Sequence, residues 1–274
     1  MRIAGVQMTS TPDMMSNLNY VENAVQRVAL QGADLVVLPE NVLLFSGRQL
    51  KAVADDENKL ALLDRISELA QQYELPILVG SHPKSYRYDK TLVSNNRVRQ
   101  SSLLFSADGS EVARYDKIHL FDAAVSDKAG EYKESDYIEP GDLRTTVIDV
   151  KDVKVGLSIC YDIRFPELFR QLSSKGADII IVPAAFTYQT GKAHWHALLR
   201  ARAIENQCYV LGVNQCGWHT DSRQTYGHTQ LIDPWGEVLA ELGESPGEIV
   251  EALDLSVLRT VREKMPCLSH RRFD

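Results

Sequence analysis

Apolar residues along the chain occur either in short continuous runs or at helical spacing, and the two patterns alternate. Continuous runs at residues 2–8, 35–38 and 76–79 predict buried strands. Between the first two runs, apolar residues recur at helical spacing after Ser16, which we expect to cap a helix. A second helix is predicted over 62–73. This part of the chain therefore predicts β-α-β units of a parallel sheet.

Two further pairs of runs are separated by short polar turns and predict β-hairpins. The first pair is 101–105 with 111–115, joined through Ala107-Asp-Gly, and the second is 145–150 with 153–159, joined through Lys151-Asp152. A strand pattern at the end of the second hairpin stops at Cys160, where a helix pattern begins. A side chain at such a junction can be exposed at the end of a buried strand.

The chain also contains an internal echo. Residues 32–39 and 176–183 share Gly, Ala, Asp and Pro at matching offsets, and each segment follows a helix and reads as a buried parallel strand. This predicts two related halves whose sheets pack on each other, giving a four-layer α-β-β-α sandwich in one domain over 1–274. Glu40 and Ala184 follow the two segments, at the strand ends where open α/β sheets bind ligands.

Composition narrows the classes of function. The 274 residues are 44% hydrophobic and 24% charged, with a net charge of −7 and no long basic run, which argues against nucleic-acid binding. No apolar run approaches the ~20 residues of a membrane span, and no secretory signal is recognisable, so we expect a cytoplasmic protein. Cysteines 160, 208, 216 and 267 form no CxxC pair, which predicts reduced thiols. Its partners are expected to be small molecules and itself.

Three residues are candidates for chemistry. Glu40 follows an apolar strand, where a carboxylate is usually solvated but can act as a general base in a closed pocket. Lys117 would ordinarily be a surface charge, yet a buried ammonium could stabilise an oxyanion. Cys160 would ordinarily be an inert core residue, yet its thiolate could act as a nucleophile beside a base or a positive charge.

Three other kinds of site can be considered for the same part of the chain: a serine nucleophile, a Cys-His pair and a metal site. Gly156-Leu-Ser158 begins like the nucleophile elbow of esterases, but the final glycine is missing and Ser158 falls inside a strand. A Cys-His enzyme could use one of five histidines, none of which has a distinctive spacing (His119, His194, His196, His219 and His228). His194 and His196 would point to different faces of a helix, and no acidic partner is spaced for zinc, so no metal is expected.

Three ordered motifs resemble those of the nitrilase superfamily of carbon-nitrogen hydrolases. They are Leu38-Pro39-Glu40, the segment Tyr115-Asp-Lys117-Ile-His-Leu-Phe-Asp122, and the segment Ser158-Ile-Cys160-Tyr-Asp-Ile-Arg164-Phe-Pro-Glu-Leu168. Later segments, including 198–209 and 226–238, are similar to the Nit branch in particular. The resemblance spans nearly the whole chain and implies the same α-β-β-α fold that the echo predicts.

The resemblance implies a Glu-Lys-Cys triad that hydrolyses an amide to acid and ammonia through a thioester, without a cofactor. Glu40 would be the general base, Lys117 the oxyanion stabiliser and Cys160 the nucleophile, with the backbone N–H of Tyr161 completing the oxyanion hole. The superfamily also tends to have a second pocket glutamate. The residue that matches it here is Glu134, with Glu131 as a nearby alternative.

The branch that the chain resembles includes ω-amidases, which act on short α-keto acid amides, and amidases of deaminated glutathione, which its segments match better. Both substrates carry carboxylates, and Arg164 is a suitable bidentate partner, although it could instead pair with Asp162 or Glu167. Phe186 and Thr187 are also expected to bind substrate. A departure is Gln100, where relatives commonly carry Asn, which predicts a different neighbouring pocket wall.

Two other classes remain open from sequence: a non-catalytic binding protein on the same fold, and an enzyme that transfers the acyl group to an acceptor other than water. A homodimer is implied by the resemblance. The helices after Pro166 and around 195–206 carry six apolar residues, more than one sheet needs, on what would be an outer face. These are Leu168, Phe169, Leu172, Leu198, Leu199 and Ile204.

Overall fold

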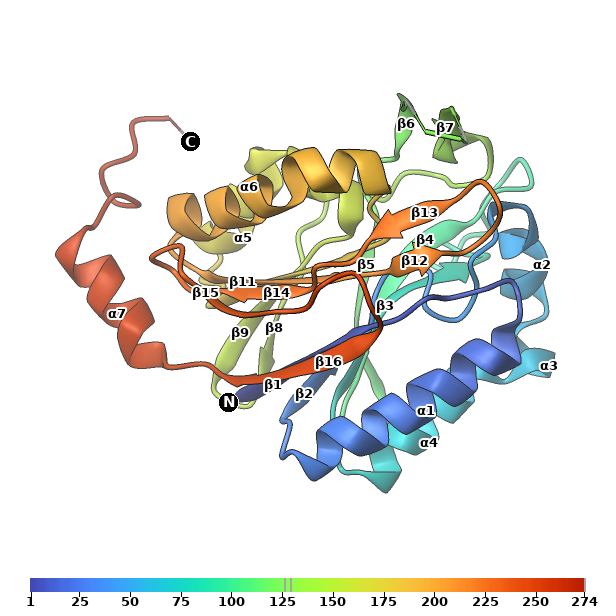
Figure 1. Ribbon diagram of the computed structural model, residues 1–274, viewed down its shortest axis with the longest axis horizontal. Coiled ribbons are helices and arrows are strands. Elements are labelled where there is room, and N and C mark those ends of the chain that lie inside the picture. Colours follow the sequence, from blue (N-terminus) through green and yellow to red (C-terminus); the bar gives the residue numbers. More distant parts are fainter. Residues whose placement is uncertain (126, 129, 274) are drawn as a thin grey trace.

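Two six-stranded sheets form the centre of the molecule in the computed structural model, which describes residues 1–125, 127–128 and 130–273 (Figure 1). In spatial order, the first sheet contains β16 (Gly247–Ala252), β1 (Arg2–Gln7), β2 (Leu35–Val37), β3 (Ile77–Lys84), β4 (Arg99–Phe105) and β5 (Glu111–Asp116). The second contains β15 (Val238–Glu241), β14 (Gln230–Ile232), β11 (Tyr209–Asn214), β10 (Ile179–Ala184), β9 (Val153–Leu157) and β8 (Val147–Val150).

The two sheets repeat one pattern. Each has a parallel trio, β1-β2-β3 in the first sheet and β9-β10-β11 in the second, and antiparallel strands extend each trio on both sides. The two echo segments form β2 and β10, which are the middle strands of the trios. Both predicted hairpins are present, as β4–β5 and β8–β9. The expected α-β-β-α architecture is therefore confirmed.

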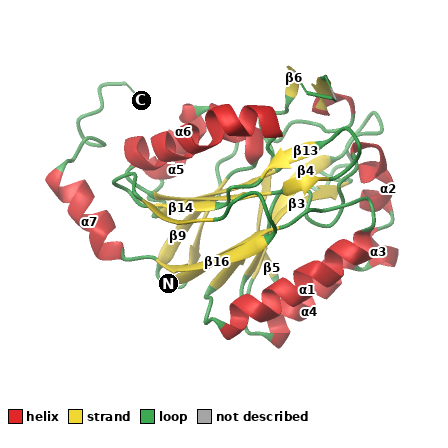
Figure 2. Cartoon of the chain, in the orientation of Figure 1, coloured by secondary structure: helices red, strands yellow, loops and turns green. Residues whose placement is uncertain are grey.

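Helices cover the two outer faces, as the red helices in Figure 2 show. α1 (Met14–Leu30) and α4 (Leu62–Gln72) pack on the first sheet, and α5 (Pro166–Ser174) and α6 (Tyr188–Asn206) lie over the second. The remaining helices are α2 (Leu50–Asp55), α3 (Glu57–Leu60) and α7 (Leu255–Lys264). Two short ribbons complete the structure: β6 (Asp122–Ala124) with β7 (Glu131–Lys133), and β12 (Cys216–Trp218) with β13 (Gln224–Tyr226).

The first helix begins earlier than predicted. Asp13, not Ser16, is its N-cap: the carboxylate of Asp13 accepts hydrogen bonds from the backbone N–H groups of Met15 and Ser16, at 3.0 and 3.2 Å. The hydroxyl of Ser16 donates to the same carboxylate at 2.8 Å. Asp and Ser can both cap a helix, so the sequence alone did not distinguish Asp13 from Ser16. In the structure Asp13 has the extended backbone that an N-cap requires, so the prediction of Ser16 was wrong.

The apolar surplus predicted for the outer helices is largely absent. Four of the six residues are fully packed inside the chain, between the helices and the second sheet: Leu168, Phe169, Leu172 and Leu199. Leu198 is partly buried, and only Ile204 is exposed, at 42%. Leu172 lies over Gly156 of β9 and Leu199 over Gly212 of β11, so these side chains cover the second sheet. No helix in the described ranges has the length and apolar character to cross a membrane.

The end of β2 lies directly against β3, and a glycine makes this approach possible. A Cβ atom on Gly80 would lie 2.2 Å from the carbonyl oxygen of Leu38 and 2.4 Å from the carbonyl carbon of Pro39. These are backbone atoms, which cannot move aside as a flexible side chain can. Glu40 directly follows Pro39, so the close packing at Gly80 also sets the position of the Glu40 backbone, from which its carboxylate extends.

We expect Gly80→Ala to lower the free energy of unfolding by about 2–3 kcal/mol, because the methyl group must push two strands apart. Urea unfolding followed by circular dichroism measures this. Gly243→Ala is the matched control, since a Cβ atom there meets no atom within 4 Å, and it should change the free energy by less than about 0.5 kcal/mol. Equal effects in the two variants would contradict the proposed close packing.

Candidate active site

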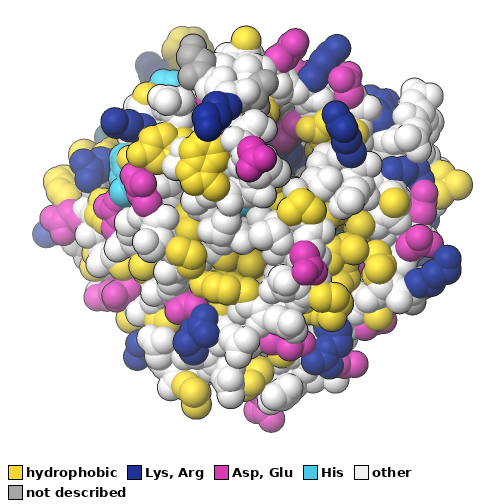
Figure 3. Space-filling model, turned by 45° about the vertical axis from the view of Figure 1, so that its right-hand side comes forward, with side chains coloured by type: hydrophobic (Ala, Val, Ile, Leu, Met, Phe, Trp, Pro, Cys, Tyr) yellow, Lys and Arg dark blue, Asp and Glu magenta, His cyan; other side chains and the backbone are white. Residues whose placement is uncertain are grey.

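A cleft opens where the central strands of both sheets end. It measures about 340 Å³ when its open mouth and the adjoining solvent are included. The upper part of the face in Figure 3 is hollowed, with acidic atoms set back inside the hollow. The cleft is lined by Glu40, Asn41, Phe121, Glu134, Cys160, Tyr161, Arg164, Ala185, Phe186, Thr187, Thr190 and Arg223. Every residue that the sequence predicted for the site lines the cleft, except Lys117, which lies beneath it.

Glu40 joins the two sheets at this point. It is buried, and one carboxylate oxygen accepts a hydrogen bond from the ammonium of Lys117 at 2.8 Å. The other oxygen accepts from the backbone N–H of Ala185, also at 2.8 Å. Ala185 follows β10 as Glu40 follows β2, so the ends of the two echo segments meet through this carboxylate. Both oxygens are thereby fixed, with one edge of the group facing the cleft.

Lys117 follows β5 and is completely buried between two carboxylates. Its ammonium lies 2.8 Å from Glu40 and 2.9 Å from Glu134. Burial alone would lower the pKa of Lys117, but the charges of Glu134 and Glu40 outweigh it and hold that pKa well above its usual range. The lysine is therefore a fixed positive charge at neutral pH.

Glu134, not Glu131, is the second carboxylate at the site. It begins a short 3₁₀ turn, Glu134–Asp136, and besides contacting Lys117 it accepts a hydrogen bond from the backbone N–H of Phe121 at 2.8 Å. Glu131 lies on β7 with its side chain exposed to solvent. The resemblance therefore selected the residue that reaches the cleft.

Cys160 lies on a sharp turn after β9. Its φ angle is +47°, a left-handed conformation that costs a non-glycine residue about 1–3 kcal/mol. A 3₁₀ turn, Cys160–Arg164, follows, and α5 begins only at Pro166, so the predicted direct passage from strand to helix is interrupted by this turn. Burial raises the pKa of the Cys160 thiol well above its usual range, the charge of Glu40 adds to this, and Lys117 opposes it. The thiol is thus neutral at rest, and the carboxylate of Glu40 lines the same cleft.

Asp162 holds this turn in place. The fully buried carboxylate accepts hydrogen bonds from the backbone N–H of Ile159 at 2.9 Å and from the hydroxyl of Tyr115 at 2.7 Å. It also bonds to the backbone and the ring of His119, at 3.1 and 2.7 Å. Sequence reasoning considered Asp162 only as a partner for Arg164. Its role depends on contacts with residues more than forty positions away, for which the local pattern carries no signal.

Across the described residues, Arg164 forms no ion pair with either carboxylate that was a possible structural partner, Asp162 or Glu167. Asp162 is engaged elsewhere, and within the described chain no ion pair joins Arg164 to Glu167. Its guanidinium lies against the rings of Tyr161 and Phe186, and one nitrogen is 3.3 Å from the ring of His194. Arg164 is therefore available to an anionic ligand in the cleft.

A second arginine, which sequence reasoning missed, lines the opposite part of the cleft. Arg223 comes from the loop between β12 and β13, and its guanidinium stacks 4.3 Å from the ring centre of Tyr132. It donates to the carbonyl oxygen of Ala185 at 3.3 Å, while its buried Nη1 has no hydrogen-bond partner. A buried guanidinium nitrogen without a partner is costly in the absence of a ligand. No recognisable motif surrounds Arg223, so its place in the cleft could not be predicted from the sequence.

The cleft adjoins a second cavity, with which it shares the lining residues Asn41, Phe121, Glu134 and Arg223. Gln100, the departure noted in the sequence, lies outside the cleft but donates to the side-chain oxygen of Asn41 at 2.7 Å. Gln100 can therefore affect the wall of the cleft only indirectly, by holding the side chain of Asn41. The shared residues leave room for a ligand longer than the cleft alone.

The rival nucleophile and bases are occupied elsewhere. The hydroxyl of Ser158 donates to the carbonyl oxygen of Ile181 at 2.8 Å inside the second sheet. Among the described residues that line the cleft there is no histidine. His119 turns to Asp162, and burial lowers the pKa of His219 to about 4, where it bonds to Ser10. The geometry thus favours the glutamate over a histidine as the base for Cys160.

Comparison with known proteins decides the family. The profile of the carbon-nitrogen hydrolases matches residues 2–263. The chain belongs to this family. The deaminated glutathione amidase of Yersinia enterocolitica is 41% identical over 272 residues, which make up 99% of this chain and 93% of that protein. The resemblance drawn from the motifs is confirmed, and this carbon-nitrogen hydrolase is an amidase.

Solved structures agree. Nit3 of Saccharomyces cerevisiae, a member of branch 10 of the nitrilase superfamily, has a TM-score of 0.84 at 31% identity, covering 100% of this chain and 97% of that one. An amidase from Nesterenkonia sp. AN1 has a TM-score of 0.79 at 27% identity, covering 97% of this chain and 98% of that one. A mutant of that amidase shows Michael addition of acrylamide at its active-site cysteine.

The raised pKa of Cys160 predicts an unusual pH profile. A thiol with an ordinary pKa of about 8.5 would give activity that rises with pH until the thiolate is fully formed. Here the folded-state pKa lies well above the usual range, so the thiol stays protonated and depends on Glu40 to accept its proton. We expect kcat/KM for a soluble amide to change less than about threefold between about pH 7 and pH 9. A tenfold rise per pH unit that levels off near 8.5 would contradict this.

Proposed function

We propose that this protein hydrolyses deaminated glutathione, using Cys160 as nucleophile, Glu40 as general base and Lys117 as oxyanion stabiliser. The observation that carries the proposal is the group of three buried residues in which Glu40 and Cys160 line one cleft and Glu40 accepts a hydrogen bond from the ammonium of Lys117 at 2.8 Å. A carboxylate beside a neutral thiol, next to a fixed positive charge, supplies what acyl transfer to sulfur needs.

In the first half of the reaction, Glu40 takes the thiol proton while the sulfur of Cys160 forms a bond to the amide carbon. The oxygen of the amide gains negative charge, which the ammonium of Lys117 and the backbone N–H of Tyr161 stabilise. Glu40 then passes the proton to the amide nitrogen, and the carbon-nitrogen bond breaks. The acid part of the substrate remains on sulfur as a thioester.

In the second half, water takes the place of the departed amine. Glu40 accepts a proton from this water as its oxygen attacks the thioester carbon. The carbon-sulfur bond breaks, the acid leaves, and the proton returns to the sulfur of Cys160. Glu134 contacts no reacting atom in this scheme. It positions Lys117, because its charge helps to compensate the burial of the ammonium.

Deaminated glutathione fits the cleft better than a short ω-amide does. It retains the two carboxylates of glutathione, and the cleft has two arginines free of ion-pair partners in the described ranges, Arg164 near the nucleophile and Arg223 toward the adjoining cavity. Each guanidinium can bind a carboxylate through two hydrogen bonds. The name of the 41% identical relative supports the same substrate. Phe186 and Thr187 would contact the acyl part of the substrate between the two arginines.

The leaving group follows from the substrate. Deaminated glutathione has no primary amide, so its hydrolysis releases an amine instead of the ammonia expected from the sequence. Ammonia would be the product of the alternative, an ω-amidase acting on α-ketoglutaramate or α-ketosuccinamate. These substrates have one carboxylate and would leave Arg223 without an anion.

The proposal includes a homodimer formed through α5 and α6, a single domain over 1–274 and a cytoplasmic location. Support for the dimer comes from the nitrilase resemblance and from Ile204, which is exposed on α6. All four cysteines are free, which suits a reducing compartment. Sedimentation analysis would test the dimer directly.

We expect Cys160→Ala to lower kcat/KM for deaminated glutathione at least about a thousandfold, and Glu134→Gln to lower kcat about a hundredfold through a displaced Lys117. Release of the amine product measures both. Glu131→Gln is the matched control, because it removes an equivalent carboxylate outside the cleft, and its rate should equal that of the native protein. A Cys160→Ala variant that is folded and fully active would exclude catalysis by the thiol.

The substrate assignment predicts different effects for the two arginines. Arg223→Met should raise the KM for deaminated glutathione about ten- to hundredfold, the value of one charge-assisted interaction, and should leave that for α-ketoglutaramate nearly unchanged. Arg164→Met should raise the KM for both substrates. If Arg223→Met raises the KM for the two substrates equally, or if the native protein prefers α-ketoglutaramate, the assignment to deaminated glutathione is wrong.

A further inference from the structure

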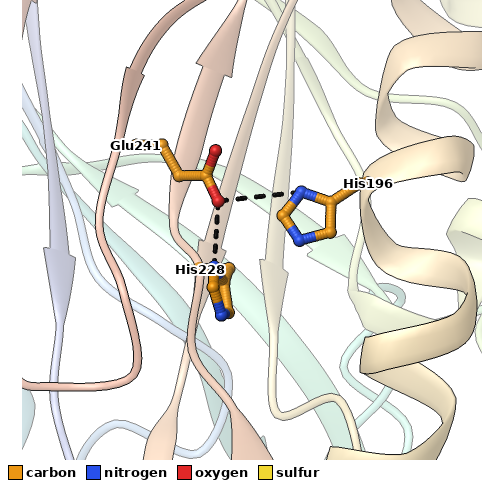
Figure 4. A group of neighbouring side chains, drawn as sticks. All are labelled: His196, His228 and Glu241. Atoms are coloured by element: carbon orange, nitrogen blue, oxygen red, sulfur yellow. Dashed lines mark hydrogen bonds and ion pairs between the residues drawn. The ribbon is translucent and has the colours of Figure 1, made fainter.

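Outside the cleft, two histidines and a glutamate converge at the edge of the second sheet (Figure 4). His196 comes from α6, His228 from the segment between β13 and β14, and Glu241 ends β15. One carboxylate oxygen of Glu241 lies 2.9 Å from Nδ1 of His228 and 3.7 Å from Nδ1 of His196. Three separate parts of the chain thus direct ligand atoms at one point.

The spacing of these atoms suits a metal ion. Tetrahedral zinc with bonds of about 2.0–2.1 Å keeps its ligand atoms about 3.4 Å apart, and two imidazoles with one carboxylate are a ligand set that zinc accepts. The three ligand atoms here all lie within 4.8 Å of one another. The side chains of His196 and Glu241 are 40% and 35% exposed, so they can close around an ion without disturbing the core.

The two rings are already oriented by their surroundings. Nε2 of His196 lies 3.2 Å from the hydroxyl of Tyr226, so its other nitrogen faces Glu241. The ring of His228 stacks on Tyr226 at 4.3 Å, and its carbonyl oxygen accepts a hydrogen bond from the indole of Trp195 at 2.8 Å. Metal-binding histidines usually have their second nitrogen held by an outer partner, as Tyr226 holds that of His196.

A neighbouring amide supplies an independent sign of a missing ligand. Gln230 is 1% exposed, and its amide nitrogen lies 3.3 Å from Nδ1 of His196 while its buried amide oxygen has no hydrogen-bond partner. Buried amide oxygens are almost always satisfied. Since the two ends of an amide differ little in shape, turning it over would direct the oxygen at the group. It could then serve as a fourth ligand.

We propose that His196, His228 and Glu241 bind one Zn²⁺ ion, with the amide oxygen of Gln230 or a water molecule as the fourth ligand. On binding, the ion would take the place of the proton between His228 and Glu241, and the neutral ring of His228 would carry its proton on Nε2 instead. The ion would link α6 to the β14–β15 edge of the second sheet. The sequence predicted no metal because His194 and His196 point to different faces of a helix and no acidic residue is spaced near them to bind zinc. His194 does face elsewhere, toward Arg164, and the true partners are more than thirty residues away.

The test must keep zinc from binding the thiol at the active site. Tag-free Cys160→Ala protein is therefore titrated with Co²⁺, followed by its visible absorption, and Zn²⁺ is then added as competitor. We expect one Co²⁺ per chain, full displacement by Zn²⁺, and no thiolate-to-cobalt band. Addition of Glu241→Gln or His196→Gln should weaken binding by about tenfold or more. Zn²⁺ should raise the melting temperature of the Cys160→Ala protein, and much less that of the double variants.

Two matched controls separate this site from incidental binding. Glu237→Gln removes a carboxylate just before β15, and His270→Gln removes an exposed histidine near the end of the described chain. Both should bind cobalt as Cys160→Ala alone does. The proposal is overturned if binding does not saturate at one ion, if Glu241→Gln binds equally well, or if zinc binds only when Cys160 is present. None of these outcomes depends on which amide the enzyme hydrolyses.

Discussion

The burial of one ammonium group constrains the rest of the structure. An unpaired Lys117 in this position would cost several kcal/mol, so the fold must bring carboxylates to it. Glu40 arrives from the end of β2 and Glu134 from the turn after β7, and the second oxygen of Glu40 reaches across to Ala185 in the other sheet. One positive charge therefore fixes the relative position of both sheets and of the loop that closes the cleft.

In the same arrangement the nucleophile, the positive charge and the base are different residues, and none of them could catalyse the reaction alone. Cys160 lies in a strained left-handed turn and is a neutral thiol, so it is exposed to substrate but unreactive until a base removes its proton. Asp162 holds the turn from below without touching the cleft. Lys117 remains charged but cannot donate a proton readily. Glu40 is held by Lys117 and shares the cleft with Cys160, which suits it to carry protons to and from the thiol.

Local patterns in the sequence were enough to predict the architecture and the part of the site that lies at strand ends. The repeated Gly-Ala-Asp segments identified the middle strands of both sheets, and the motifs around Glu40 and Cys160 lie at strand ends, where position follows from strand length. Arg223 and the support given by Asp162 could not be predicted, because both depend on contacts across long stretches of chain. The outer leucines were misjudged for a related reason: Leu172 is buried against Gly156 of β9 and Leu199 against Gly212 of β11, contacts that the helical spacing alone does not reveal.

The order of strands in the first sheet has a consequence for synthesis of the chain. β1, made first, pairs along its whole length with β16, which ends at Ala252. One edge of β1 therefore stays without its partner until the chain has been made as far as Ala252, about 12–50 s after β1 at usual elongation rates. During that interval the growing chain presents an unpaired strand edge that other chains can join. Pairing of β16 with β1 covers this edge and removes that route to aggregation.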